Sequence, residues 1–165
     1  MSRFALVFAA TVLGAAPLAA QPRFSITFPT ARSTTSIDGR LLVFIAADTT
    51  GEPRFQVSDN TATAQVFGVD VDDWRAGVAQ TIDARAFGYP LRAVADLPAG
   101  RYRVQALVNR YQTFRRSDGH TVKLPPDRGE GQQYARKPGN LFSQPATVTI
   151  SRSGVTSLVL DQEVT

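Results

Sequence analysis

Asp96-Leu-Pro-Ala-Gly-Arg-Tyr-Arg-Val-Gln-Ala-Leu-Val-Asn-Arg-Tyr-Gln-Thr-Phe114 carries the clearest structural signal in this chain of 165 residues. Pro98 fixes its own φ and Gly100 permits a positive φ, so residues 97–100 predict a tight turn. From residue 101 onward, apolar and polar side chains alternate. One face of this segment holds Tyr102, Val104, Ala106 and Val108, and the other holds Arg101, Arg103, Gln105 and Asn109. The alternation predicts a strand of about nine residues with one face in a core.

Short runs with strand character recur on both sides of this segment. They cover residues 23–28, 40–47, 54–58, 65–72, 80–83, 121–124, 146–150 and 156–161. The apolar run at residues 40–47 predicts a central strand that is covered on both sides. Residues 54–58 are expected to point Phe55 and Val57 inward, residues 80–83 to form an edge strand, and the last two runs to form a C-terminal hairpin.

No part of the sequence has the periodicity of an amphipathic helix. Short strands separated by Gly, Pro, Asn and Asp predict an all-β fold, an antiparallel β-sandwich of immunoglobulin-like or related type. We expect a single domain over residues 21–165. Residues 87–90 are expected to form a turn-rich bridge. Residues 115–144 are expected to form one long irregular loop, which Tyr134 and Phe142 pin to the sandwich.

Residues 1–20 have the organisation of a secretory signal peptide. Arg3 gives a positive start, residues 4–13 are apolar or small, and small residues lead to a cleavage site after Ala20. A transmembrane anchor is the alternative, but its apolar core needs ~20 residues, and this run is much shorter. The sequence therefore predicts a periplasmic or extracellular protein without a membrane span.

The composition argues against several classes of function. The chain is 43% hydrophobic and 19% charged, contains no cysteine and has a single histidine. An exported chain without cysteine has no disulfide framework, and the usual zinc and thiolate sites lack their ligands. We expect no metal and no cofactor. Removal of Arg3 lowers the net charge from +4 to +3, too small an excess to predict a nucleic-acid partner.

Two groups of residues have the side chains of a functional site without its full pattern. Asp70, Asp72 and Asp73 offer carboxylates to Ca²⁺, but a calcium site needs more ligands, so a solvated strand face is expected. Ser117, Asp118 and His120 have the residue types of a catalytic triad. Triad residues are brought together by the fold, and the chain has no Gly-x-Ser-x-Gly elbow, so His120 is expected at the surface.

Charge is distributed unevenly along the chain. Residues 101–137 hold nine basic residues and three acidic ones, whereas residues 48–83 hold seven acidic residues and two basic ones. The basic half is suited to an anionic ligand, but the two halves are equally suited to complement each other within one domain or across a dimer.

Several motifs together resemble a known kind of domain. They are Phe67-Gly-Val-Asp-Val-Asp72, Leu97-Pro-Ala-Gly-x-Tyr-x-Val-Gln-Ala106, Asn109-Arg-Tyr111, Asp118-Gly-His-Thr-Val-x-Leu-Pro125, Gly129-Glu-Gly-Gln132 and Pro138-Gly-Asn-Leu141. The chain resembles the N-terminal β-rich region of large exported bacterial proteins described as esterases. In those proteins this region precedes an α/β-hydrolase domain of the esterase D type.

The resemblance implies a non-catalytic accessory domain with an α/β-hydrolase domain as its partner. The sequence contains no nucleophile elbow, so no catalytic residue is carried over. We expect either an N-terminal fragment of a longer enzyme or a free-standing relative of the accessory domain. An independent carbohydrate- or anion-binding module is the alternative. In each case the candidate recognition residues are Arg110, Tyr111, Arg116 and His120, at the far end of the strand described first.

Overall fold

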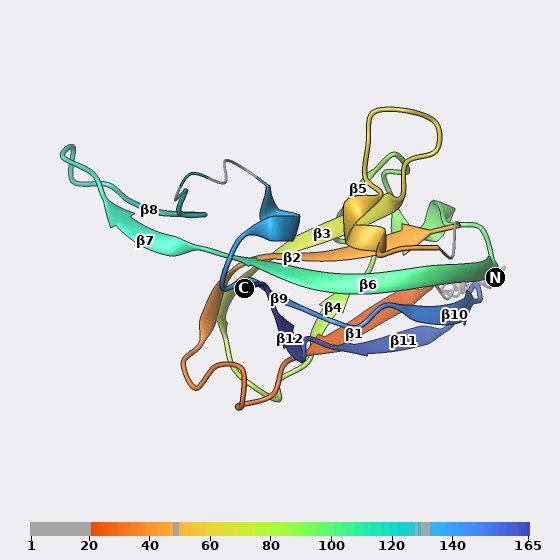
Figure 1. Cartoon of the computed structure of the whole chain (residues 1–165), viewed down its shortest axis with the longest axis horizontal. Coiled ribbons are helices and arrows are strands. Elements are labelled where there is room, and N and C mark those ends of the chain that lie inside the picture. The colour runs from red at the N-terminus through yellow and green to blue at the C-terminus, as the bar shows by residue number, and fades with distance from the viewer. Residues whose placement is uncertain (1–20, 48–49, 128, 130–132) are drawn as a thin grey trace, which may run out of the picture.

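A computed structural model describes residues 21–47, 50–127, 129 and 133–165, and the regular secondary structure of these residues is almost entirely β-strand (Figure 1). The predicted signal peptide lies outside the described residues. The strands are β1 (Arg23–Thr27), β2 (Ile37–Ala46), β3 (Gln65–Trp74), β4 (Gln80–Ile82), β5 (Phe87–Tyr89), β6 (Gly100–Arg110), β7 (Gln112–Arg115), β8 (Thr121–Leu124), β9 (Leu141–Phe142), β10 (Ala146–Ile150), β11 (Val155–Val159) and β12 (Gln162–Glu163). Three short 3-10 helices, η1 (Pro53–Phe55), η2 (Val94–Asp96) and η3 (Tyr134–Arg136), complete the described elements.

Two sheets pack face to face, which confirms the predicted β-sandwich. The larger sheet has the order β12-β9-β6-β2-β3-β5, and β10 pairs with the first half of β6. The smaller sheet has the order β11-β1-β4. All pairs are antiparallel except β1 with β11, which are parallel. β7 and β8 form a separate hairpin that extends from one end of the sandwich (Figure 1).

The core lies between the two sheets and contains the predicted inner face of β6. Val104, Ala106 and Val108 are fully buried and pair with β2 in the centre of the larger sheet. β2 has the predicted central position between β3 and β6. The smaller sheet contributes Phe24 and Ile26, also fully buried. At ~25 cal/mol per Å² of apolar surface, this burial is the main term that stabilises a chain without disulfides.

The opposite face of β6 is also covered over half its length. Gln105 and Leu107 are fully buried there, because η1, η3 and the chain around β9 pack over this face. Tyr134 of η3 stacks on Phe44 with ring centroids 6.0 Å apart. Phe142 lies under the Arg54 guanidinium at 3.8 Å. Both aromatic residues therefore anchor this part of the chain to the sandwich, as predicted.

The prediction of a strand at residues 54–58 is wrong. Pro53 begins the 3-10 helix η1, since its fixed φ suits the first helical position and its missing N–H is not needed there. Phe55 is 44% exposed, and Val57 is only half-buried. Instead of facing the core, the Phe55 ring lies beneath the guanidinium groups of Arg54 and Arg136.

The predicted C-terminal hairpin is also wrong. Both strands exist, but β10 pairs with β6 in the larger sheet and β11 pairs with β1 in the smaller one. The turn between them carries the chain from one sheet to the other. β10 thereby pairs with an edge of β6, and β11 with an edge of β1; a local hairpin of β10 and β11 would leave both of these edges open.

Two further segments are more regular than the sequence predicts. Residues 87–89 form strand β5 rather than a bridge, and pair with residues 66–68 of β3. Within residues 115–144, β8 matches the expected strand at residues 121–124, but η3 and β9 were not expected. No helix in the part of the chain that the structure describes has the length and apolarity needed to cross a membrane.

Candidate functional site: a cavity and a projecting hairpin

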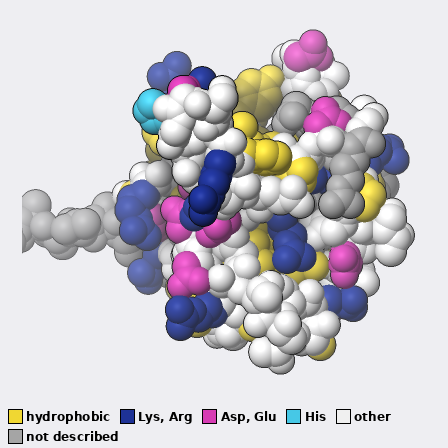
Figure 2. Space-filling view, turned by 90° about the vertical axis from the view of Figure 1, so that its left-hand side faces the viewer, with side chains coloured by type: hydrophobic (Ala, Val, Ile, Leu, Met, Phe, Trp, Pro, Cys, Tyr) yellow, Lys and Arg dark blue, Asp and Glu magenta, His cyan; other side chains and the backbone are white. Residues whose placement is uncertain are grey.

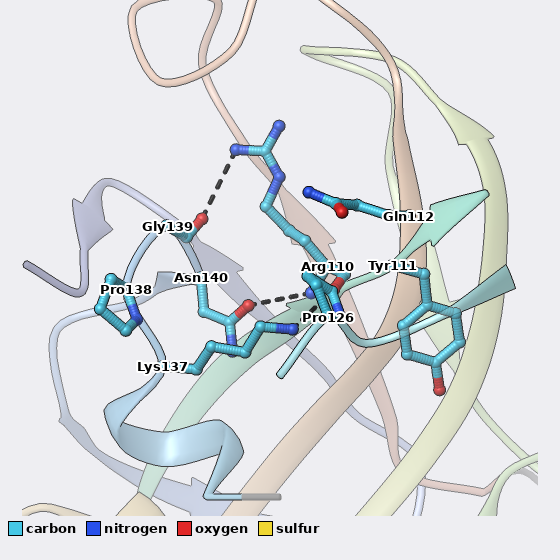
Figure 3. A pocket seen from close by; sticks show the side chains of 8 residues that line it. All are labelled: Arg110, Tyr111, Gln112, Pro126, Lys137, Pro138, Gly139 and Asn140. Carbon is cyan, nitrogen blue, oxygen red and sulfur yellow. Dashed lines mark hydrogen bonds between the residues drawn. The ribbon is translucent and has the colours of Figure 1, made fainter. Parts of the chain in front are cut away.

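A cavity of about 340 Å³ opens where β6 ends (Figure 3). Residues from two distant parts of the sequence line it: Arg110, Tyr111, Gln112, Pro126, Lys137, Pro138, Gly139 and Asn140. Residues 110–112 lie where β6 ends and β7 begins, and residues 137–140 connect η3 to β9. Two of the four predicted recognition residues, Arg110 and Tyr111, therefore border one cavity.

Asn140 holds the two walls of the cavity together. Its side chain is fully buried, and its Oδ1 accepts a hydrogen bond of 2.9 Å from the Arg110 backbone N–H. Its Nδ2 donates to the Tyr134 carbonyl oxygen at 2.8 Å and to Asn109 Oδ1 at 3.2 Å. The Lys137 ammonium, also buried, donates to the Arg110 carbonyl oxygen at 3.2 Å. The backbone of Arg110 is thus fixed by groups on the opposite wall.

The Arg110 guanidinium uses little of its hydrogen-bonding capacity on the described residues. Its one hydrogen bond among the described residues goes to the Gly139 carbonyl oxygen, at the long distance of 3.5 Å. It makes no ion pair with any carboxylate of the described chain. A guanidinium carries five N–H donors in a planar fork that matches a carboxylate. This side of the cavity is chemically suited to an anion.

Tyr111 borders the cavity, but its ring is turned away from Arg110, Gln112 and Asn140 (Figure 3). Its backbone N–H donates to the Asp38 carbonyl oxygen at 2.8 Å, which extends the pairing of the chain beyond β6. Burial raises the pKa of the Tyr111 hydroxyl; the Asp70 charge raises it further, and the Arg40 charge opposes both. The Tyr111 hydroxyl is therefore close enough to Arg40 on β2 and Asp70 on β3 to interact with their charges.

The other two predicted residues, Arg116 and His120, lie at the tip of the β7–β8 hairpin. Each contacts Asp118, Arg116 through Nη2 at 2.8 Å and His120 through Nδ1 at 3.2 Å. The His120 side chain is 77% exposed, which confirms its predicted surface position and is visible in Figure 2 as the histidine on the projecting hairpin. The four candidates thus belong to two places, the cavity and the hairpin.

The β7–β8 hairpin has one face toward the sandwich and one away from it. Register pairs Thr113 with Lys123 and Phe114 with Val122, and opposite residues in a pair share a face. Lys123 reaches back to the carboxylates of Asp38 at 3.0 Å and Asp72 at 2.8 Å. The face of Phe114 and Leu124 is therefore directed away from this contact, and these side chains are 41% and 52% exposed.

The acidic residues of β3 serve as ion-pair partners. Asp70 binds Arg40 at 2.9 Å, Asp72 binds Lys123, and Asp73 binds Arg75 at 2.9 Å. The described ranges contain no group of three or more His, Asp or Glu side chains placed to hold a metal ion. The pair between Asp72 and Lys123 joins the acidic and basic parts of the sequence, one of the arrangements that the charge pattern allowed.

The contacts of Asp38 predict that the folded state is sensitive to acid. The Asp73 backbone N–H, which donates to Asp38 Oδ1 at 2.8 Å, and the Lys123 ammonium hold the pKa of Asp38 below its usual range. A carboxyl group with a lowered folded pKa stabilises the fold above its unfolded pKa of about 4, and this stabilisation is lost as pH falls through the folded value. The Tm of Asp38→Asn should therefore fall less than the Tm of wild type when the pH is lowered from about 5 to about 3, as measured by thermal unfolding.

Asp59→Asn is the matched control, since Asp59 is exposed and makes no ion pair in the described part of the chain. We expect its pH profile to follow wild type. A profile for Asp38→Asn that also follows wild type would show that the contacts of Asp38 with Asp73 and Lys123 do not stabilise the folded state.

Sequence reasoning missed the second wall of the cavity. Asn140 and Lys137 lie about thirty residues beyond Arg110, in a segment expected to be irregular. One signal was present: Pro138-Gly-Asn combines residues that favour turns with an amide able to satisfy backbone groups. Gly139 adopts a positive φ of 86°, a conformation that glycine adopts at little cost.

No protein-family model, no curated protein and no solved structure matches the chain.

Proposed function

We propose that this chain is a non-catalytic, exported accessory domain that binds an esterase-like α/β-hydrolase. The observation that carries the proposal is the β7–β8 hairpin, which projects from the sandwich and has all four β7 residues exposed (Figure 1). The partner class comes from the resemblance of the sequence motifs to the β-rich region of exported bacterial esterases. The hydrolase belongs to the same longer protein or to a separate chain.

The outward face of the hairpin has the chemistry of a docking surface. Phe114 and Leu124 provide apolar area, and Arg116, two residues beyond Phe114, places a cation near them; the Arg115 side chain belongs to the opposite face. Aromatic and arginine side chains dominate the energetics of protein interfaces. The matching surface on the partner is an apolar depression with an acidic rim.

The position of His120 supports a role other than catalysis. A nucleophile needs a general base within ≈ 3 Å that a third group orients. Among the described residues, the His120 side chain contacts only Asp118, and no serine or threonine hydroxyl bonds to it. An exposed hairpin tip also leaves the imidazole without a surrounding pocket.

We expect the purified protein to hydrolyse p-nitrophenyl acetate no faster than buffer, because no serine or threonine hydroxyl among the described residues is hydrogen-bonded to the His120 side chain. His120→Ala is expected to leave this background unchanged, which separates catalysis from simple imidazole chemistry at the surface. Saturable hydrolysis proportional to protein concentration would overturn the non-catalytic assignment.

The coding sequence around the chain tests the partnership. A reading frame that continues past codon 165 into an α/β-hydrolase domain, or a hydrolase gene directly beside it, is the expected finding. A stop codon at this position together with no neighbouring hydrolase gene would overturn the partnership.

A further inference from the structure

A second cavity lies on the larger sheet, at the edge where β5 leaves β3 uncovered. It has a volume of about 280 Å³ and is lined by Arg40, Gly68, Val69, Asp70, Gln80, Thr81, Arg85 and Phe87. Phe87 of β5 is 79% exposed, more than any other large hydrophobic side chain in the described residues. We call this region the Phe87 groove. An aromatic ring this accessible beside a cavity offers an apolar surface to a ligand.

Gly68 lets neighbouring side chains lie close over the floor of the groove. Register places it between Leu42 on β2 and Phe87 on β5, so these three residues form one row across the outer face of the sheet. A Cβ at this position would lie 2.8 Å from Leu42 Cδ2 and 3.2 Å from Arg40 Nε. Because Gly68 lacks a side chain, those of Leu42 and Arg40 fill this space and lie close over β3, at the floor of the groove.

An ion pair borders this floor. Arg40 Nη1 bonds Asp70 Oδ1 at 2.9 Å, and Arg40 Nη2 donates a long bond of 3.4 Å to the Gly68 carbonyl oxygen. Asp70 Oδ2 has no partner among the described residues, and the Asp70 side chain is 66% exposed. A carboxylate acceptor and guanidinium donors therefore stand side by side, each with capacity for further hydrogen bonds.

The charges in the Phe87 groove are balanced. Arg40 pairs with Asp70, and Arg85 pairs with Asp83 at 3.1 Å. In this respect the Phe87 groove differs from the Arg110 cavity, where the guanidinium has no carboxylate partner in the described chain. A balanced set of charges favours a neutral polar ligand over an anion, because neither sign is left in excess.

We infer that the Phe87 groove binds a neutral glycan. A sugar ring has one face of C–H groups, which packs on an aromatic ring, and a rim of hydroxyls that both donate and accept. Phe87 supplies the aromatic face, Asp70 accepts from hydroxyls, and the Arg40 guanidinium donates to them. The inference does not depend on the proposed hydrolase partner.

Affinity electrophoresis of the purified protein tests this inference. The probes are gels containing xylan, mixed-linkage β-glucan or galactomannan, with polygalacturonate as the charged comparison. We expect slower migration in at least one neutral gel, and a loss of affinity of about tenfold or more in Phe87→Ala. Phe114→Ala, which removes an exposed ring of the same type from the hairpin, is expected to bind as wild type.

Asp70→Asn is expected to weaken binding without abolishing it, since it removes the charge of the acceptor and keeps its shape. No retardation in any neutral gel would overturn the inference. So would retardation that survives Phe87→Ala. Retardation restricted to polygalacturonate and lost in Arg110→Ala would instead assign ligand binding to the Arg110 cavity, and the proposed hydrolase partnership would stand in every case.

Discussion

Replacing Gly39 by alanine is expected to lower the free energy of unfolding by about 3 kcal/mol. Gly39 lies on β2 opposite Arg110, in the pairing of the two central strands. A Cβ there would overlap the Asn109 carbonyl oxygen and lie 3.2 Å from the Arg110 Cα. Both are backbone atoms held by the sheet, so β2 and β6 would have to separate at the end that carries the Arg110 cavity.

Urea unfolding followed by circular dichroism measures the effect of Gly39→Ala. Gly154→Ala is the control, because its Cβ would meet only the Ser151 Oγ at 3.0 Å, and a hydroxyl at the end of a side chain can rotate away. We expect this control to stay within about 0.5 kcal/mol of wild type. Equal unfolding midpoints for the two variants would contradict the tight approach of β2 and β6.

Gln105→Ala is expected to cost a similar amount, about 3 kcal/mol, because it removes the partner of one buried and two partly buried polar groups. Gln105 Oε1 accepts from the Arg54 backbone N–H at 3.1 Å. Its Nε2 donates to Glu52 Oε2 at 2.8 Å and to the Ser143 carbonyl oxygen at 3.0 Å. One side chain on β6 thus ties down both the η1 segment and the chain between β9 and β10.

The same urea measurement applies, with Gln144→Ala as the matched control. Gln144 is exposed, and its side chain makes no hydrogen bond in the described structure, so we expect little change. A loss below about 0.5 kcal/mol for Gln105→Ala would mean that water replaces its three contacts and that the outer layer is held by packing alone.

The fold was predictable where strands alternate cleanly. β1, β3 and β6 each place apolar side chains in the core at every second position, and their existence follows from the local sequence. The partners of β10 and β11 were not predictable, because they depend on which edges of β6 and β1 are open. Local pattern finds a strand but does not identify its partner.

The segments that cover the outer face of β6, namely η1, η3 and the chain around β9, also show that a local sequence pattern does not determine what a residue contacts. Phe55 has the spacing of a core residue, yet Pro53 starts a 3-10 helix that turns it toward two arginines. Gln105 alternates with core residues and was expected on a polar face, yet it is fully buried. Burial there is decided by segments that return from far along the chain.

The candidate site was predictable in part. Arg110 and Tyr111 were found because they end a clear strand in a polar and aromatic cluster. Their separation from Arg116 and His120 depends on where the β7–β8 hairpin points. The Phe87 groove carries no sequence signal, since it is formed by the register of Gly68 with residues on two neighbouring strands.

Titration calorimetry between this protein and an α/β-hydrolase domain from the same reading frame or a neighbouring gene tests the proposed docking of the hairpin. The account predicts binding that falls at least about tenfold in the double variant Phe114→Ser and Leu124→Ser, which removes the apolar part of the outward face. Phe87→Ser, a matched change of a more exposed ring outside the hairpin, is predicted to bind as wild type. Wild-type protein that does not bind the hydrolase domain, or equal affinity of wild type and the double variant, would contradict it.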